Sequence, residues 1–254
     1  DNFIGRAPNP DTVSFRKNVC AQLIEYSQYK KLSDEYIIGK IADFLAEDIP
    51  NGDITTESTT PDNSEITAEI HAIEKLVFAG SEIIPHCFGQ NCQVTINHKN
   101  GAMLSKGDII GVVTGSAREI LSRERVMLNL IQRLCGIATL SHEYAKIAKP
   151  SNVKILDTRK TTPGLRLFEK YAVANGGAFN HRLNLSNGIL IKDNHIVAAG
   201  SVTNATISAR KQGIHLPLEL EVDNFDQIHE ALKIGVDGFL LDNMKPETIR
   251  SAVS

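Results

Sequence analysis

The sequence contains no tryptophan, no CxxC cysteine pair, no long apolar run and no excess of positive charge. Its four cysteines lack the spacing of a zinc site or a disulfide framework, so we expect reduced thiols and a cytoplasmic protein. No apolar run reaches the roughly 18 residues of a membrane span, and residues 1–18 lack an apolar signal core. A net charge of −3 argues against a general nucleic-acid binder, which needs a basic face.

What is present is the composition of an ordinary globular protein. Of 254 residues, 42% are hydrophobic and 22% are charged, which excludes a disordered, collagen-like or coiled-coil chain. The length fits one large α/β domain, or a barrel with a small partner domain. Because the first residue is Asp1 and not methionine, we expect the gene product to contain further residues.

The first part of the chain changes its pattern near residue 50. Residues 1–48 are predicted to be mainly helical, with Ser33 as the N-cap of a helix whose apolar residues recur at helical spacing. From residue 66 to 115 short runs alternate apolar and polar residues between glycine turns, which predicts a small antiparallel sheet. We therefore predict an N-terminal α/β sandwich domain over residues 1–115 and a second domain over residues 116–254.

A long helix is predicted from Arg118 to Gly136. One side is apolar, and the opposite side carries a polar stripe formed by Arg118, Ser122, Arg125, Asn129 and Gln132. Such a stripe is usually a solvated face. Here an arginine lies among neutral amides instead of paired charges, which also leaves room for a binding role.

Four apolar runs follow Pro150, in the segments 153–158, 188–193, 216–223 and 235–243. Runs of this kind joined by helices favour parallel βα units, and an amphipathic helix ending at Gly235 separates the last two. Each run ends in ionisable residues, as expected for the rim of an α/β barrel. An open flavodoxin-like sheet also binds ligands at strand ends, but no GxGxxG fingerprint follows a strand.

Positive charge is concentrated between Arg159 and Lys192. This segment holds six lysines and arginines against one acid, Glu169, and is therefore +5 in a chain of net charge −3. His181 and Arg182 lie in the same segment. Such a cluster at strand ends suits a small polyanion, because arginine presents a planar fork and lysine a mobile charge.

Several charged residues leave alternatives open. Arg166 and Lys170 are four residues apart on a predicted short helix and are expected to be solvated, and Lys154 is expected at the surface. Glu221 and Asp242, at the ends of neighbouring strands, are candidates for Mg²⁺ ligands facing a bound phosphate. Alternatively, they would stabilise a cationic transition state. The residues alone predict a barrel enzyme with a multiply anionic substrate.

The motifs in this cluster are similar to those of the quinolinate phosphoribosyltransferases. The resemblance runs from about residue 33 to the end. It rests on LDTRKTTPGLRLFEKYAV, GGAFNHRLNLSNGILIKDNH, LELEVD and LLDN, preceded in order by EDIPNGDITT and RERVMLNLIQRLCGIAT. It implies an open-faced α/β sandwich followed by an incomplete α/β barrel. It further implies a homodimer in which each subunit covers the other's barrel.

The resemblance also implies the reaction. Quinolinate and phosphoribosyl pyrophosphate would give nicotinate mononucleotide, pyrophosphate and carbon dioxide, with Mg²⁺, as a step of NAD biosynthesis. The residues matching those that hold the two carboxylates are Arg159, His181, Arg182 and Lys192. Arg125 matches an arginine that reaches the partner subunit's site.

The remaining matched residues belong to the second substrate. Lys160 and Lys192 match residues near phosphoribosyl pyrophosphate, and Glu221 and Asp242 match acids near its ribose and metal. We therefore predict catalytic roles for Lys160, Lys192, Glu221 and Asp242. The segment GGA before NHR departs from an expected GGG, and LNLSN departs from an expected Gly-Leu-x-Asp. Neither departure replaces a charged ligand.

Two alternatives remain beside this interpretation. A related enzyme of the same fold with another anionic acceptor would be favoured by loss of the carboxylate-binding arginines, but Arg125, Arg159 and Arg182 are present. A catalytically inactive binding protein would fit a chain that ends naturally at Ser254. We expect instead a further C-terminal segment that completes the barrel and binds the ribose 5′-phosphate.

Overall fold

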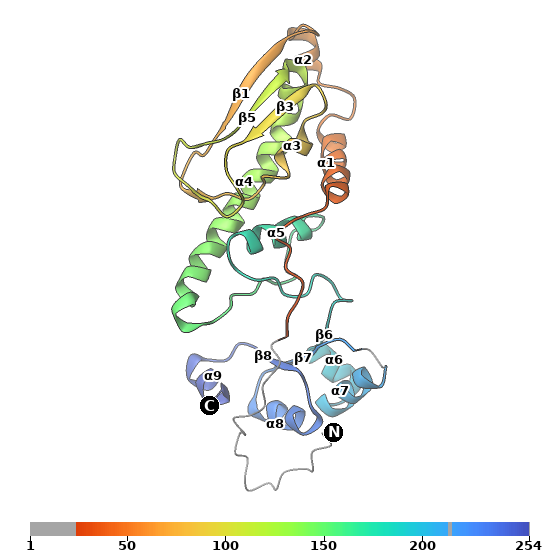
Figure 1. Cartoon of the computed structure of the whole chain (residues 1–254). Coiled ribbons are helices and arrows are strands. Elements are labelled where there is room, and N and C mark those ends of the chain that lie inside the picture. The colour runs from red at the N-terminus through yellow and green to blue at the C-terminus, as the bar shows by residue number, and fades with distance from the viewer. Residues whose placement is uncertain (1–23, 213–214, 254) are drawn as a thin grey trace. The chain divides into compact units, whose positions relative to one another are not determined.

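The computed structural model describes residues 24–212 and 215–253, which form two compact units (Figure 1). The first unit spans residues 27–183. The second contains the described residues among 184–253 together with residues 24–26. The predicted domain boundary after residue 115 falls inside the first unit, one residue before the end of the strand β5, so that division stays a prediction.

An antiparallel sheet forms one layer of the first unit. Its strands are β1 (Glu65–His71), β3 (Cys92–Ile96) and β5 (Ile109–Ser116), in the order β1-β5-β3. Val113 of β5 faces Ala68 on one side and Val94 on the other. The short strands β2 (Leu76–Val77) and β4 (Met103–Leu104) pair separately. The antiparallel module predicted from the alternating pattern is confirmed.

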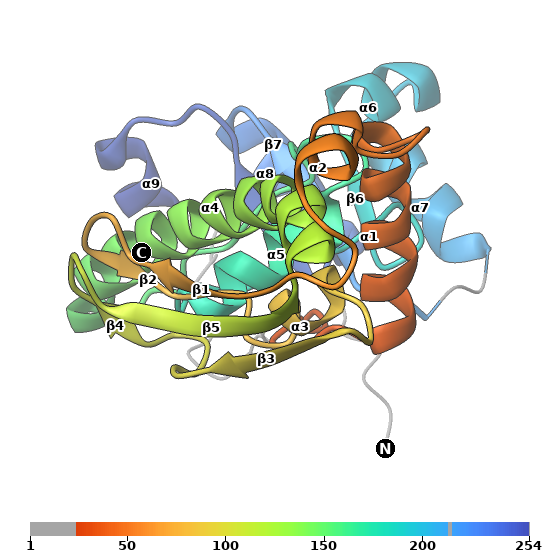
Figure 2. The same ribbon diagram turned by 90° about the horizontal axis from the view of Figure 1, so that it is seen from above.

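The helix α4 (Ala117–Ala148) lies along this sheet, as Figures 1 and 2 both show. Ser116 caps its start by accepting a hydrogen bond from the Glu119 amide. Its apolar side enters a core shared with α1 (Asp34–Asp48) and α3 (Ile84–Cys87). The helix is longer than predicted: it continues to a 3₁₀ turn (Lys149–Ser151), where Pro150 cannot supply an amide.

The N-terminal helix was predicted correctly only in part. α1 begins at its N-cap Ser33, whose hydroxyl accepts from the Tyr36 amide, as expected. Residues 24–32 are not helical, so the prediction is wrong there, and residues 1–23 lie outside the described residues. Within residues 24–32, the Gln28 side chain and the Tyr29 amide form hydrogen bonds with Asn180. The short helix α2 (Ile54–Thr59) follows, capped by Asp53.

The second unit is built on a parallel sheet. β6 (Ile189–Ile191), β7 (Leu218–Val222) and β8 (Gly238–Leu241) pair in this order. Its helices are α6 (Asp193–Ala199), α7 (Val202–Lys211), α8 (Phe225–Ile234) and α9 (Pro246–Val253). α8 ends at Gly235, which has a positive φ of 92°. The parallel βα interpretation and the α/β fold class are confirmed.

The first predicted run, residues 153–158, does not form an extended strand. Only Leu156 makes a bridge, to Phe179. The backbone groups next to Phe179 bind side chains instead: the Asn180 amide donates to Gln28, and the His181 amide donates to Asp157. Phe179 pairs with Ile155 and Asp157, so the His181 amide is the group that would continue this ladder to the Asp157 carbonyl, but it binds the Asp157 carboxylate instead. The helix α5 (Arg166–Asn175) lies between these two segments in the sequence.

Three of the four cysteines lie within the described residues. Cys87, Cys92 and Cys135 are free, and burial raises the pKa of the Cys87 thiol to about 12, so it stays protonated. Cys20 lies outside the described residues. Among the helices that the structure describes, none is both long and apolar enough to cross a membrane.

Candidate active site

The predicted site residues divide between the two units. Arg125, Arg159, Lys160, His181 and Arg182 belong to the first unit, and Lys192, Glu221 and Asp242 belong to the second. Within the first unit the bridge between Leu156 and Phe179 is parallel, so residues 157–160 and 180–182 leave it in the same direction. Arg159 with Lys160, and His181 with Arg182, thus follow adjoining backbone segments on the same side of this bridge.

Asp157 and Lys170 hold these two segments together. Lys170, on α5, forms an ion pair with Asp157, and their side chains are only 1% and 8% exposed. Asp157 Oδ1 also accepts the His181 amide at 2.8 Å, and Lys170 Nζ donates to the His181 carbonyl at 3.0 Å. Asn180 Nδ2 donates to Asp157 Oδ2 and to the Lys170 carbonyl, both at 2.8 Å.

The prediction that Arg166 and Lys170 are solvated is therefore wrong. Lys170 is fully buried, and burial lowers the pKa of its ammonium, while Asp157 acts in the opposite direction. Arg166 is half-buried and donates to the Thr161 hydroxyl at 3.0 Å and to the Leu183 carbonyl at 3.4 Å. Both side chains face the loop instead of water, which helical spacing alone could not indicate.

Arg159 offers donors that the protein does not use. The residue is half-buried, and within the part of the chain that the structure describes its Nε is buried without a hydrogen-bond partner. Lys160 beside it is exposed. His181 and Arg182 are 8% and 5% exposed. Because a buried donor without a partner is costly, the Arg159 guanidinium is suited to an anion that completes its hydrogen bonds.

Arg125 lies apart from these residues on α4. It is exposed, and its side chain has no ion pair or hydrogen bond among the described residues. By contrast, Arg118 at the start of the polar stripe pairs with Asp62 and donates to the carbonyls of Glu57 and Thr60. The stripe therefore contains one engaged and one available guanidinium.

The second unit places its acids on neighbouring strands. Glu221 lies near the end of β7 and forms an ion pair with Lys192 at 2.8 Å. Asp242 directly follows β8, and its amide donates to the Val222 carbonyl at 3.0 Å. The Lys192 amide donates to His195 Nδ1 at 3.0 Å, which fixes the turn into α6. Lys192, Glu221 and Asp242 thus lie at the same edge of the parallel sheet, as predicted.

These two acids fit a magnesium ion that also binds substrate phosphates. Mg²⁺ in phosphate-processing sites is held by one or two carboxylates, substrate oxygens and water. Glu221 and Asp242 supply two carboxylates, while the described residues contain no group of three or more candidate metal ligands. Two carboxylates are within the number of protein ligands that such a site uses.

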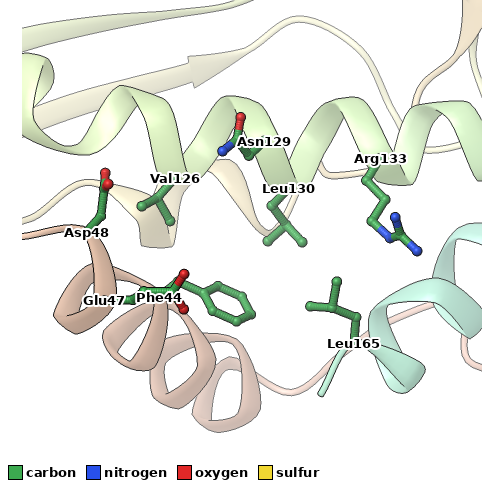
Figure 3. A pocket seen from close by; sticks show the side chains of 8 residues that line it. All are labelled: Phe44, Glu47, Asp48, Val126, Asn129, Leu130, Arg133 and Leu165. Atoms are coloured by element: carbon green, nitrogen blue, oxygen red, sulfur yellow. The ribbon is translucent and has the colours of Figure 1, made fainter. Parts of the chain in front are cut away.

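A cavity of about 310 Å³ lies elsewhere in the first unit, between α1, α4 and the residue before α5 (Figure 3). Phe44, Leu130 and Leu165 face one another across it, as Figure 3 shows. Arg133 at one end is held by Glu169, at 2.6 Å. None of the predicted site residues lines this cavity.

Sequence reasoning missed the residues that support the cluster. Asp157 is one of the ionisable residues at the end of the run 153–158, but nothing in the sequence indicates its partners, and Lys170 was predicted to be solvated. The signal for Asn180 was its position directly before His181 and Arg182, and the signal for His195 was its place three residues after Lys192. Each of these side chains forms a hydrogen bond with a backbone group of another residue, and a pattern of residue types does not reveal such bonds.

Comparison with known proteins identifies two matching family models. The model described as quinolinate phosphoribosyl transferase, N-terminal domain, matches residues 53–135, and the C-terminal domain of the same family matches residues 137–254. A probable nicotinate-nucleotide pyrophosphorylase (carboxylating) of Bacillus subtilis is 46% identical over 211 residues, which are 82% of this chain and 73% of that protein. The Mycobacterium leprae nicotinate-nucleotide pyrophosphorylase (carboxylating) is 40% identical over 78% of this chain and 72% of its own length.

Solved structures agree with this assignment. The Francisella tularensis nicotinate-nucleotide pyrophosphorylase superposes with a TM-score of 0.85 at 35% identity, covering 90% of this chain and 82% of that one. The Ehrlichia chaffeensis enzyme gives 0.82 at 38% identity, covering 88% and 81%. Both the ordered motifs and the fold thus match over most of the chain, which belongs to the quinolinate phosphoribosyltransferase family.

Proposed function

We propose that this protein transfers the phosphoribosyl group of phosphoribosyl pyrophosphate to quinolinate. The products are nicotinate mononucleotide, pyrophosphate and carbon dioxide, and the reaction is a step of NAD biosynthesis. The observation that carries the proposal is the cationic cluster of Arg159, Lys160, His181 and Arg182 on two adjoining segments, in a chain of this family. A dianion taken out of water needs several such partners.

The first step is displacement at the anomeric carbon. The ring nitrogen of quinolinate attacks this carbon with its lone pair, and the bond to the pyrophosphate oxygen breaks with its electrons. Arg159, His181 and Arg182 hold the two carboxylates, so that the nitrogen is aimed at the ribose. Glu221 and Asp242 stabilise positive charge that develops on the sugar, and Lys160 and Lys192 bind the departing phosphates.

Decarboxylation follows from the charge that the transfer creates. Once glycosylated, the ring nitrogen is a pyridinium cation, which accepts the electron pair left behind when the adjacent carboxylate leaves as carbon dioxide. A proton then replaces the carboxylate on that ring carbon. The cations of the cluster bind carboxylates in their ionised form. The carboxylate that departs as carbon dioxide therefore stays ionised, as this step requires.

We propose Mg²⁺ as the cofactor, held by Glu221 and Asp242 together with the substrate. When bound, the ion neutralises phosphate charge and stabilises the leaving group. Lys192, paired with Glu221 at 2.8 Å, would exchange this partner for a phosphate oxygen. We propose a cytoplasmic location, because the spacing of the four cysteines does not fit a disulfide framework.

An acceptor comparison tests the proposed function. With phosphoribosyl pyrophosphate and Mg²⁺ present, the protein is expected to form nicotinate mononucleotide from quinolinate far faster than from nicotinate, which lacks the second carboxylate. Chelation of Mg²⁺ is expected to abolish turnover. The nucleotide is measured by chromatography and mass spectrometry. Equal rates with both acceptors would contradict the assignment of the cluster to two carboxylates.

We also propose a homodimer with shared active sites, in which Arg125 reaches the partner subunit's site. The support is its exposure and the lack of any side-chain partner among the described residues. Mixing an Arg125→Ala variant with a Lys160→Ala variant is expected to recover about one quarter of the wild-type activity. Random exchange makes about half of the dimers mixed, and each mixed dimer has one intact site. No recovery in dimers shown to be mixed would exclude a shared site.

A further inference from the structure

The buried ion pair between Lys170 and Asp157 is an unusual way to hold a loop. Its side chains are 1% and 8% exposed, so both charges have left water. Desolvation of this kind offsets much of the attraction between the charges, and apolar residues of similar volume often stabilise a fold equally well. The pair therefore calls for an explanation other than stability.

Both members of the pair bind the backbone of the same residue. Asp157 accepts the His181 amide at 2.8 Å, and Lys170 donates to the His181 carbonyl at 3.0 Å. The two bonds fix both peptide planes that flank this residue. One of these planes leads directly into Arg182, and Arg159 lies two residues after Asp157 on the other segment. The pair thus links the two segments that carry the carboxylate-binding cations.

The helix that carries Lys170 is itself anchored by the residues on either side. Glu169 accepts from Arg133 of α4 at 2.6 Å, and the Tyr171 hydroxyl donates to Glu82 at 2.9 Å. Neither contact reaches residues 180–182. Glu169 also accepts a hydrogen bond from the Thr162 amide at 3.3 Å, so it contacts the segment that follows Lys160. Of the three side chains, Lys170 is the one that binds His181 in the described structure.

We propose that Lys170 and Asp157 are positioning residues that set the spacing of the cations for the two quinolinate carboxylates; this inference rests on the proposed function. Neither residue touches the substrate. A dianion is bound tightly only when its partners are held in place, and a displacement of about 1 Å can cost about 100-fold in rate. The consequence of losing the pair is a weaker hold on quinolinate, with phosphoribosyl pyrophosphate little affected.

The test compares the wild-type protein with Lys170→Met, the double variant Lys170→Met/Asp157→Asn and the control Tyr171→Phe. The double variant removes both charges together and therefore leaves no unpaired buried charge. It is expected to fold with a melting temperature near that of the wild type, and above that of Lys170→Met. Its KM for quinolinate is expected to rise about 10- to 100-fold, while KM for phosphoribosyl pyrophosphate changes less than about threefold.

Tyr171→Phe alters the same helix without touching the loop. It is expected to keep KM for quinolinate within about threefold of the wild-type value, whatever its melting temperature. A double variant that is stable and binds quinolinate normally would overturn the proposal. So would a double variant that does not fold, because the pair would then serve stability. Turnover by the wild-type protein separately reports the proposed function.

Discussion

Replacing Arg159 by alanine is expected to lower kcat/KM for quinolinate by about 100-fold or more. The guanidinium is half-buried, and its Nε has no partner within the described residues, so its donors are available for a carboxylate. Loss of one charged hydrogen-bonding partner from a desolvated pair costs about 2–5 kcal/mol, and each 1.4 kcal/mol is about tenfold. Steady-state kinetics with both substrates varied measures the change.

Two further variants complete this experiment. Arg159→Lys keeps the charge but loses the planar fork, so its kcat/KM is expected between those of the alanine variant and the wild type. Lys106→Ala removes an exposed positive charge from a turn of the same unit and is expected to change kcat/KM less than about threefold. A folded Arg159→Ala variant with nearly wild-type kinetics would remove Arg159 from the site.

Replacing Phe168 by alanine is expected to lower the free energy of unfolding by about 3–5 kcal/mol. Phe168 is fully buried on α5, and its ring lies 5.1 Å from Tyr36 and 6.3 Å from Phe44, both on α1. The substitution leaves a cavity where α5 packs against α1. Urea denaturation followed by circular dichroism measures the loss.

The matched control for this prediction is Leu140→Ala on α4. Leu140 is 56% exposed, so its truncation is expected to change the free energy of unfolding by less than about 0.5 kcal/mol. A loss below about 1 kcal/mol for Phe168→Ala would show that α5 is not anchored by its aromatic contacts. Lys170 would then lie on a helix that is too weakly held to position the loop.

The spacing of apolar residues predicted the helices and strands that pack one face against a hydrophobic core. The antiparallel sheet, the cap at Ser33 and the parallel strands after residue 188 all follow from alternation, helical spacing and cap chemistry. The run at 153–158 failed because the Asp157 carboxylate binds the His181 amide, which would otherwise continue the ladder. A pattern of apolar residues does not reveal which partner a backbone group finds.

The charged residues of the candidate site could be predicted from the sequence. The buried residues that hold their backbone in place could not. The excess of cations between Arg159 and Lys192 is visible in the sequence, and the strand-end positions of Glu221 and Asp242 follow from the βα order. The burial of Lys170 was not predictable, because its partner lies thirteen residues away in a loop. Charge spacing on a helix reports neighbours on that helix only.

The most direct test of the account uses quinolinate labelled with ¹³C in the carboxyl group next to the ring nitrogen. With phosphoribosyl pyrophosphate and Mg²⁺, the protein is expected to release one labelled carbon dioxide for each nicotinate mononucleotide formed, and the nucleotide is expected to carry no label. Mass spectrometry of both products measures the ratio. A labelled nucleotide, or no nucleotide at all, would contradict the claim that this protein is a decarboxylating quinolinate phosphoribosyltransferase.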